Sequence, residues 1–205
     1  MAVPPAYTVS TPRLQLRCWD PGDAEGLFAT VEDNVKHLGR YLAWVPNRPT
    51  SVDAQVAVLR RFRVWFDRGE QYFYGAFDPS TGEVLGGIGL HHSVGPDALE
   101  IGYWLTRHRI GQGLATEMVS ALIRVAFEIE DAQRVEIRCS VSNLASVRIP
   151  QRLGFEHEAT LPRRLPYAKG VDDMMIWSLW VRDYRRSQLG KLAIDARDGA
   201  GRRLL

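Results

Sequence analysis

Short segments with strand-like patterning recur along the chain. Residues 13–18 alternate polar and apolar positions, and residues 174–181 do the same. Between them, turn sequences such as Asp78-Pro79-Ser80-Thr81-Gly82 separate apolar runs, which predicts an antiparallel meander. Together the patterns predict about seven strands, over residues 13–18, 72–77, 84–91, 99–105, 134–141, 155–161 and 174–181.

Four other segments carry apolar residues at helical spacing. The first begins at Asp20-Pro21, where the carboxylate can cap free amides and proline fits the first turn. The others are expected from residues 50–51 to Gly69, over 113–130 and over 143–153. Because helices interrupt the order of the strands, we expect an α/β fold with a mixed, mostly antiparallel sheet and helices on both faces.

The length of 205 residues suits a single domain with a substantial buried core. We assign this domain to residues 1–187. Residues 188–205 are polar, basic and glycine-containing, so we expect them to form a flexible C-terminal tail.

Composition narrows the classes of function. The 26 Lys and Arg residues barely exceed the 24 Asp and Glu residues, too small an excess for the basic surface of a nucleic-acid binder. The chain start lacks a signal-peptide pattern, and no later apolar run reaches the ~18 residues of a membrane span, so we expect a cytoplasmic protein without a membrane partner. Cys18 and Cys139 lack metal-ligand or redox spacing and are expected to be buried, reduced thiols.

The segment Ile110-Gly111-Gln112-Gly113-Leu114-Ala115 joins the predicted strand 99–105 to the predicted helix 113–130. Free amides and the positive dipole end at a helix start bind anions such as pyrophosphate, and glycines allow close approach to the backbone. Arg107 and Arg109 add cations that can meet a second phosphate. Taken alone, the spacing also fits a connector whose glycines only relieve steric crowding.

Two other phosphate-binding motifs do not fit this segment. A P-loop requires Gly-Lys-Ser/Thr, whereas Gly113 is followed by Leu114 and Ala115. A dinucleotide fingerprint requires a small residue where Thr116 stands and an acid at the end of the next strand, whereas Glu136 lies inside its predicted strand.

Three motifs follow one another in the second half of the chain. They are Glu100-Ile101-Gly102-Tyr103-Trp104-Leu105, then Ile110-Gly111-Gln112-Gly113-Leu114-Ala115-Thr116-Glu117, then Asn143-Leu144-Ala145-Ser146 ending in Leu153-Gly154-Phe155. This run resembles the core of the GNAT acetyltransferases, particularly the RimJ/RimL-like branch that includes ribosomal-protein N-terminal acetyltransferases. Weaker similarity extends to Thr11-Pro12-Arg13-Leu14 and Tyr41-Leu42-Ala43-Trp44.

The resemblance implies the GNAT fold, whose sheet splays apart between strands 99–105 and 134–141 to admit acetyl-CoA. Backbone groups of Trp104 and Leu105 would pair with the pantetheine arm. Asn143 matches the residue that touches this arm, although it can equally cap its own helix. The cofactor residues implied are Trp104, Leu105, Arg109, Ile110, Gly111, Gln112, Gly113, Leu114, Ala115, Thr116, Asn143 and Ser146.

The implied reaction is direct attack of an amine on the thioester of acetyl-CoA in a ternary complex, without a metal. Ser146 matches the acid that protonates the departing thiolate. RimL-like enzymes place a glutamate base after the Gly-Phe strand, but residues 163–167 contain no acid. Glu100 is our first candidate for the base. His91, His92, Asp172 and Asp173 are the alternatives, and only one of the two histidines can face the cleft because strand residues alternate.

The acceptor amine is left open by the sequence. We expect Trp44, His91 and Tyr103 to border it. The aromatic residues Trp44, Trp65, Tyr72, Phe73 and Tyr74 can form either an acceptor surface or core. A protein N-terminus, which the resemblance suggests, and a small amine, amino acid, antibiotic or nucleotide conjugate are equal candidates. A homodimer is a candidate assembly, and the competing interpretation is a non-catalytic acyl-CoA-binding sensor or interaction module on the same fold.

Overall fold

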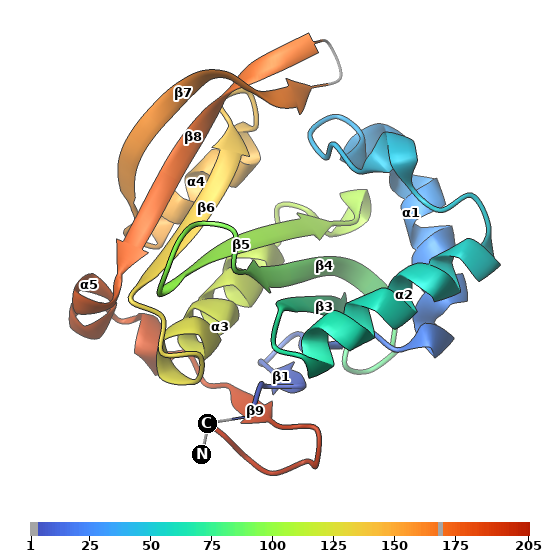
Figure 1. The fold of residues 1–205 in the computed structure, drawn as a ribbon, viewed down its shortest axis with the longest axis horizontal. Helices are drawn as coiled ribbons and strands as arrows, with labels where there is room; N and C mark the ends of the chain where they lie inside the picture. Colours follow the sequence, from blue (N-terminus) through green and yellow to red (C-terminus); the bar gives the residue numbers. More distant parts are fainter. Residues whose placement is uncertain (1–3, 168–169) are drawn as a thin grey trace.

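The computed structural model describes residues 4–167 and 170–205 and places nine strands in one sheet (Figure 1). The strands are β1 (Thr8–Ser10), β2 (Gln15–Cys18), β3 (Gln71–Phe77), β4 (Val84–His91), β5 (Ala98–Leu105), β6 (Arg134–Ser140), β7 (Glu156–Tyr167), β8 (Gly170–Trp180) and β9 (Asp195–Arg197). The α-helices are α1 (Ala24–Leu38), α2 (Val52–Asp67), α3 (Leu114–Glu128), α4 (Leu144–Arg152) and α5 (Val181–Arg186). Short 3-10 turns are η1 (Pro21–Asp23), η2 (Val45–Asn47), η3 (Arg107–Arg109) and η4 (Leu189–Lys191).

The strand order is β7-β8-β6-β5-β4-β3-β2-β1-β9, and every neighbouring pair is antiparallel except β5 and β6. This confirms the predicted fold class. All seven predicted strands form, with ends that shift by a few residues. The sheet is larger than expected because β1 and β9 extend it beyond β2.

Two apolar clusters show that helices cover both faces of the sheet. On one face, which we call the α3 face, Met118 and Leu122 of α3 pack with Leu99 and Ile101 of β5. On the opposite face, the α1–α2 face, Leu27 and Leu59 pack with Trp19 and Phe77. Among the residues described, no helix combines the length and apolar character needed to cross a membrane.

The predicted helix starts are confirmed by their caps. Asp20 accepts the amide of Gly22 at 2.8 Å, and Asp23 accepts the amide of Asp20 at 2.8 Å, so η1 leads directly into α1. Ser51 accepts the amide of Ala54 at 3.2 Å at the start of α2. These caps fix where the two helices begin above the sheet.

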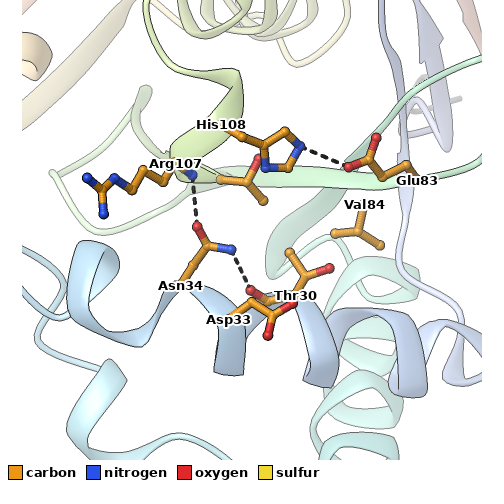
Figure 2. Close-up of a pocket in the computed structure, with 8 residues that line it drawn as sticks. Thr30, Asp33, Asn34, Glu83, Val84, Arg107 and His108 are labelled. Carbon is orange, nitrogen blue, oxygen red and sulfur yellow. Dashed lines mark hydrogen bonds and ion pairs between the residues drawn. The ribbon is translucent and has the colours of Figure 1, made fainter.

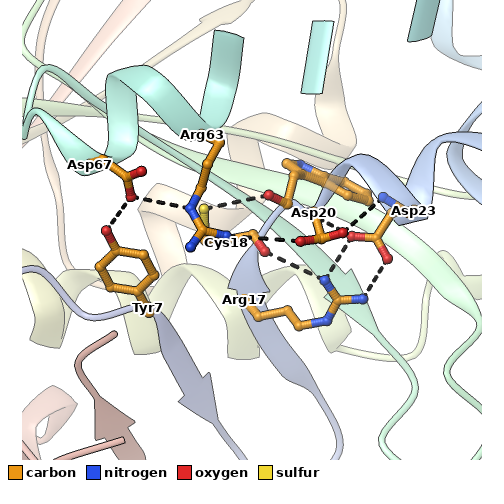
Figure 3. Close-up of polar contacts among 9 residues, drawn as sticks. Tyr7, Arg17, Cys18, Asp20, Asp23, Arg63 and Asp67 are labelled. Carbon is orange, nitrogen blue, oxygen red and sulfur yellow. Dashed lines mark hydrogen bonds and ion pairs between the residues drawn. The ribbon is translucent and has the colours of Figure 1, made fainter. Parts of the chain in front are cut away.

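A polar network attaches α2 and η1 to the N-terminal strands (Figure 3). The Tyr7 hydroxyl donates to Asp67 of α2, which also accepts the Arg63 guanidinium at 3.2 Å. Arg17 of β2 holds Asp23 in a two-bond fork of 2.6 and 2.7 Å. The network therefore anchors the α1–α2 layer to β2 and to the segment before β1.

The C-terminal segment 188–205 differs from the flexible tail expected of it. Its strand β9 pairs with β1, with Ala196 opposite Val9. Ala196 is fully buried and Ile194 is nearly so. The pairing satisfies backbone hydrogen-bonding groups on the outer edge of β1. The sequence did not predict β9 because a strand of three residues is too short to produce a periodic pattern.

Removing β9 is predicted to destabilise the fold. Deleting residues 189–205 exposes Val9 and the edge of β1 and removes the buried Ile194, a loss of about 3 kcal/mol at ordinary burial values. A loss of this size lowers Tm by roughly 6–12 °C in a chain of this length. Thermal unfolding followed by circular dichroism measures the change.

A full-length variant shows whether lost burial, rather than the shorter chain, lowers the Tm. Ala196→Asp places a carboxylate at a fully buried position and should lower Tm in the same direction, whereas Lys191→Asp at an exposed position should leave it nearly unchanged. A truncated protein with the wild-type Tm would show that residues 189–205 do not stabilise the sheet.

Candidate functional site

Strands β5 and β6 pair over a short stretch and then diverge. Only Ala98, Leu99 and Glu100 of β5 are in register with β6, opposite Arg134, Val135 and Glu136. β6 instead pairs with β8 along its whole length. Figure 1 shows β6 and β8 turning away from β5. Among the residues described, no strand therefore pairs with the second half of β5 on this side.

Hydrogen-bond alternation identifies which backbone groups lie on this free edge. Thr106 donates its amide to Leu85 of the β4 side at 2.8 Å. In an antiparallel ladder the bonded residues alternate, so Trp104 and Gly102 also direct their backbone groups toward β4. Tyr103 and Leu105 direct theirs toward the gap. The edge available for a ligand thus belongs to Tyr103 and Leu105 rather than to the predicted pair of Trp104 and Leu105.

The turn between β5 and α3 has the geometry of an anion cradle. Gly111 and Gly113 have φ of 76° and 80°, a left-handed conformation that side chains with a Cβ rarely adopt. The first helical bond runs from the Glu117 amide to the Gly113 carbonyl, so the preceding helix amides have no partner within α3. Residues 110–113 are exposed. The residues present therefore fit a pyrophosphate.

Arg13 supports this cradle and was missed as a site residue by the sequence analysis. Its guanidinium donates to Glu117 at 2.6 Å and to the Gln112 carbonyl at 2.8 Å. A Cβ on Gly113 would lie 3.4 Å from its Nη2 atom. Its place in Thr11-Pro12-Arg13-Leu14, far from the glycines in sequence, gave no local signal of this contact.

The two predicted arginine cations take different roles. Arg109 binds Glu83 at 2.6 Å and lies 3.8 Å from Asp78, so its charge is already compensated by the β3–β4 turn. Hydrogen bonding with Arg109 correspondingly lowers the pKa of the Glu83 carboxyl. The Arg107 side chain is exposed. Arg13, rather than Arg109, places a guanidinium directly beside the cradle.

A cavity of about 460 Å³ lies beside η3, between α1 and the C-terminal end of β5 (Figure 2). Asn34 spans it by accepting the Arg107 amide at 2.8 Å and donating to the Thr30 carbonyl at 2.9 Å. His108 meets Glu83 at 3.0 Å on its far side. These contacts hold η3, and with it the start of the cradle, against α1.

Ser146 and Tyr103 meet across the gap between β5 and α4. The Tyr103 hydroxyl lies 2.8 Å from Ser146 Oγ and 3.3 Å from the Ser146 carbonyl. Burial raises the pKa of the Tyr103 phenol well above its ordinary value, so the phenol stays protonated at neutral pH. Asn143 accepts the Ser146 amide at 3.3 Å and therefore caps α4. The predicted Ser146 and the predicted Tyr103 thus form one hydroxyl pair.

Cys18 and Cys139 are both buried free thiols, as expected. Burial raises the pKa of the Cys18 thiol to about 12 and that of Cys139 to about 11. Neither is a thiolate at neutral pH.

Polar and aromatic residues on the α1–α2 face of β3, β4 and β5 form two adjacent rows. One row contains Gln71, His91 and Glu100, and the next contains Phe73, Gly89 and Gly102. Of the histidines considered, His91 is half-buried in this row and His92 is exposed, as their alternation requires.

The carboxylates considered as bases all have hydrogen-bond partners. Ser93 donates to Glu100 at 2.6 Å. Hydrogen bonds from Ser140 and Ser142 lower the pKa of the Asp172 carboxyl, and Asp173 accepts the Arg163 amide at 2.9 Å. Glu100 alone among these three carboxylates lies in the row with His91.

The aromatic residues divide between core and cleft. Tyr72 and Tyr74 are buried on the α3 face and belong to the core. Trp44 is 41% exposed and packs edge-on against Trp104 at 6.3 Å. Phe73 is half-buried between α2 and His91. Trp44, Trp104 and Phe73 therefore remain available to border an acceptor.

The loop after α1 crosses the open end of the gap. Tyr41 donates its hydroxyl to the Ser142 carbonyl at 2.9 Å, in the turn between β6 and α4. This contact links the α1–α2 layer to the β6–β8 half of the sheet. The open end of the gap is therefore bordered by the cradle after β5 and by this link to the turn after β6.

Comparison with known families and proteins gives a consistent result. Residues 13–156 match the family model described as an acetyltransferase (GNAT) domain. A putative ribosomal N-acetyltransferase of Bacillus subtilis, YdaF, is 31% identical over 83% of this chain and 93% of its own. The ribosomal protein uS5-alanine N-acetyltransferase of Escherichia coli is 27% identical over 88% of this chain and 89% of its own.

A similar fold occurs in a solved structure. RimJ of Mycobacterium smegmatis, in complex with CoA-disulfide, superposes with a TM-score of 0.81 over 94% of this chain and 96% of its own. Its 20% sequence identity makes this a likeness of fold alone.

The cradle predicts a specific loss of cofactor binding. Gly113→Val strains a left-handed position and places methyl groups between the helix amides and a phosphate, so the Kd for CoA should rise at least about 100-fold. Isothermal titration calorimetry measures this directly.

The matched control is Gly82→Val in the β3–β4 turn. Gly82 has a similar φ of 73° and open space around it, so the backbone strain is comparable but the cradle is untouched. CoA binding by Gly113→Val at wild-type strength, with both variants folded, would rule out the cradle.

Proposed function

The chain belongs to the GNAT acetyltransferase family, in its RimJ/RimL-like branch, and we propose that it transfers the acetyl group of acetyl-CoA to the α-amine of a protein N-terminus. Members of this family are N-acyltransferases. The observation that carries the proposal is the free edge of β5, which leads from the glycine cradle to the Tyr103–Ser146 pair.

The free edge of β5 and the cradle follow one another along the chain, which suits one extended ligand. CoA carries a pyrophosphate at one end of its pantetheine arm and the thioester at the other, and the thioester supplies the acetyl group. Gly113 would hold the pyrophosphate, and the backbone of Leu105 and Tyr103 would pair with the arm as an added strand. This direction along β5 brings the thioester toward Tyr103 and away from the exposed cradle.

Ser146, assisted by Tyr103, is proposed to protonate the departing sulfur. The phenol of Tyr103 is protonated and can donate to Ser146 Oγ, so that the serine hydroxyl keeps its own proton to donate. A departing thiolate can take that proton. Asn143 fixes the first turn of α4 and so positions Ser146 relative to the β5 edge.

A protein N-terminus is supported as acceptor by the names of two relatives. The E. coli relative acts on the alanine of ribosomal protein uS5, and YdaF is described as a ribosomal N-acetyltransferase. Trp44 and Trp104 offer exposed and half-buried aromatic surface beside the cleft, which suits the first side chains of a peptide.

The acceptor is tested by an acetylation screen read by mass spectrometry. Peptides beginning with Ala or Ser should gain one acetyl group at the α-amine, while the same peptides with a blocked N-terminus should gain none. Small amines, including kanamycin and amino acids, form the second arm. Acetylation confined to small amines would contradict the peptide acceptor. Release of CoA above background without acetylation of any amine in the screen would contradict acetyl transfer.

The hydroxyl pair predicts a kinetic signature. Ser146→Ala should lower kcat by about 10- to 100-fold with the Kd for acetyl-CoA nearly unchanged, because the lost proton donor acts only on the leaving sulfur. Tyr103→Phe should give a smaller loss. Stopped-flow turnover and calorimetry separate the two quantities.

Arg152→Ala, exposed at the end of α4, is the control and should behave like the wild type. Unchanged kcat in Ser146→Ala would remove this residue from the mechanism.

A further inference from the structure

The residue that accepts the amine proton has several candidates from the sequence, with Glu100 first and His91 among the alternatives. We infer that His91 is this base and acts through Nε2, with Gln71 fixing its tautomer and Glu100 stabilising its charged form. The inference rests on the proposed acetyl transfer and adds a catalytic residue to it.

The tautomer follows from one short contact. His91 Nδ1 lies 2.6 Å from Oε1 of Gln71, its register partner on β3. A side-chain amide oxygen only accepts hydrogen bonds, so Nδ1 carries the proton. In the neutral ring, Nε2 then carries the lone pair. A histidine oriented in this way by a third group is the arrangement expected of a general base.

The position of the ring places Nε2 above Gly89 of β4 and beside Gly102 of β5. A Cβ on Gly89 would lie 2.7 Å from Nε2, so the imidazole lies flat across this glycine. A Cβ on Gly102 would lie 3.6 Å from the same atom. Gly102 immediately precedes Tyr103, whose backbone faces the gap. The lone pair therefore lies on the acceptor side of the strand along which the thioester would be held.

The surroundings keep the ring neutral at rest and stabilise it once protonated. Burial lowers the pKa of His91, with the Phe73 ring 4.8 Å away on its α2 side. The ionisable groups acting on it are Glu100, directly opposite on β5, and the adjacent His92. Glu100 favours the imidazolium, and His92 opposes it. A base that is neutral near pH 7 is ready to accept a proton.

The step balances without any further reactant. The amine nitrogen loses one proton to His91 Nε2 and forms a bond to the acetyl carbon. The carbon–sulfur bond breaks, its electron pair leaves with sulfur, and sulfur takes a proton from Ser146. Exchange with water returns both residues to their starting states, so an amine and a thioester give an amide and a thiol.

The test compares His91→Ala with His92→Ala, its exposed neighbour on the same chain, using an Ala-initiated peptide and acetyl-CoA. His91→Ala should lower kcat/KM by about 100-fold or more, with the Kd for acetyl-CoA unchanged and His92→Ala near wild type. Added imidazole should restore part of the lost rate. His91→Gln provides a second variant if the alanine variant unfolds.

The pH profile gives a readout that a structural role would not produce. Wild-type kcat/KM should fall as pH drops through the amine pKa of about 7.7–8.0 and fall more steeply below the lowered pKa of His91, because protonation of His91 removes its lone pair. The steeper limb should vanish in His91→Ala, which should keep only the limb of the amine. Glu100→Gln should keep the steeper limb and shift it to lower pH.

The outcomes are distinguishable. A His91→Ala variant as active as wild type, or one not rescued by imidazole and with an unchanged pH profile, overturns the base while acetyl transfer stands. A wild type that acetylates no amine overturns the proposed function and the base with it. Nitrogen-15 NMR of the resting protein gives an independent check, because a proton on Nε2 rather than Nδ1 contradicts the assignment whatever the acceptor.

Discussion

The gap between β5 and β6 is the constraint on which the rest of the molecule depends. A strand inside a sheet normally satisfies its backbone groups on both sides, whereas β5 has no register partner on the β6 side after Glu100. The fold compensates elsewhere, because β6 pairs fully with β8 and the rest of the sheet pairs continuously from β5 to β9. What remains is a rigid, unpaired edge with a helix start at its end.

The two faces of β5 divide the chemistry between them. Odd-numbered side chains lie on the α3 face, where Tyr103 reaches Ser146. Even-numbered side chains lie on the α1–α2 face, where Glu100 and Gly102 adjoin His91. In the proposed mechanism, the alternation of this one strand would place the acid and the base on opposite sides of the thioester.

Local patterns were enough to predict seven of the nine strands described, the main helices and the glycine turn before α3. Periodicity and capping residues are encoded within a few residues, as at Asp20 and Ser51. Contacts between distant segments were not predictable in this way. Arg13 at the cradle and Gln71 at His91 are brought to the site by strand register, and β9 is too short to carry a pattern. Whether Trp104 or Tyr103 directs its backbone groups toward the gap depends on which residues of β5 bond to β4. Residue types do not encode this alternation.

Amide hydrogen exchange on CoA binding tests the central claim most directly. In the free protein, the amides of Gly102 and Trp104 should already be protected by their bonds to β4, while those of Tyr103 and Leu105 should exchange faster. Saturating CoA should slow exchange at Tyr103 or Leu105 and leave Trp104 nearly unchanged. Protection confined to other segments, with Tyr103 and Leu105 exchanging as before, would contradict the account that β5 binds the cofactor by its free edge.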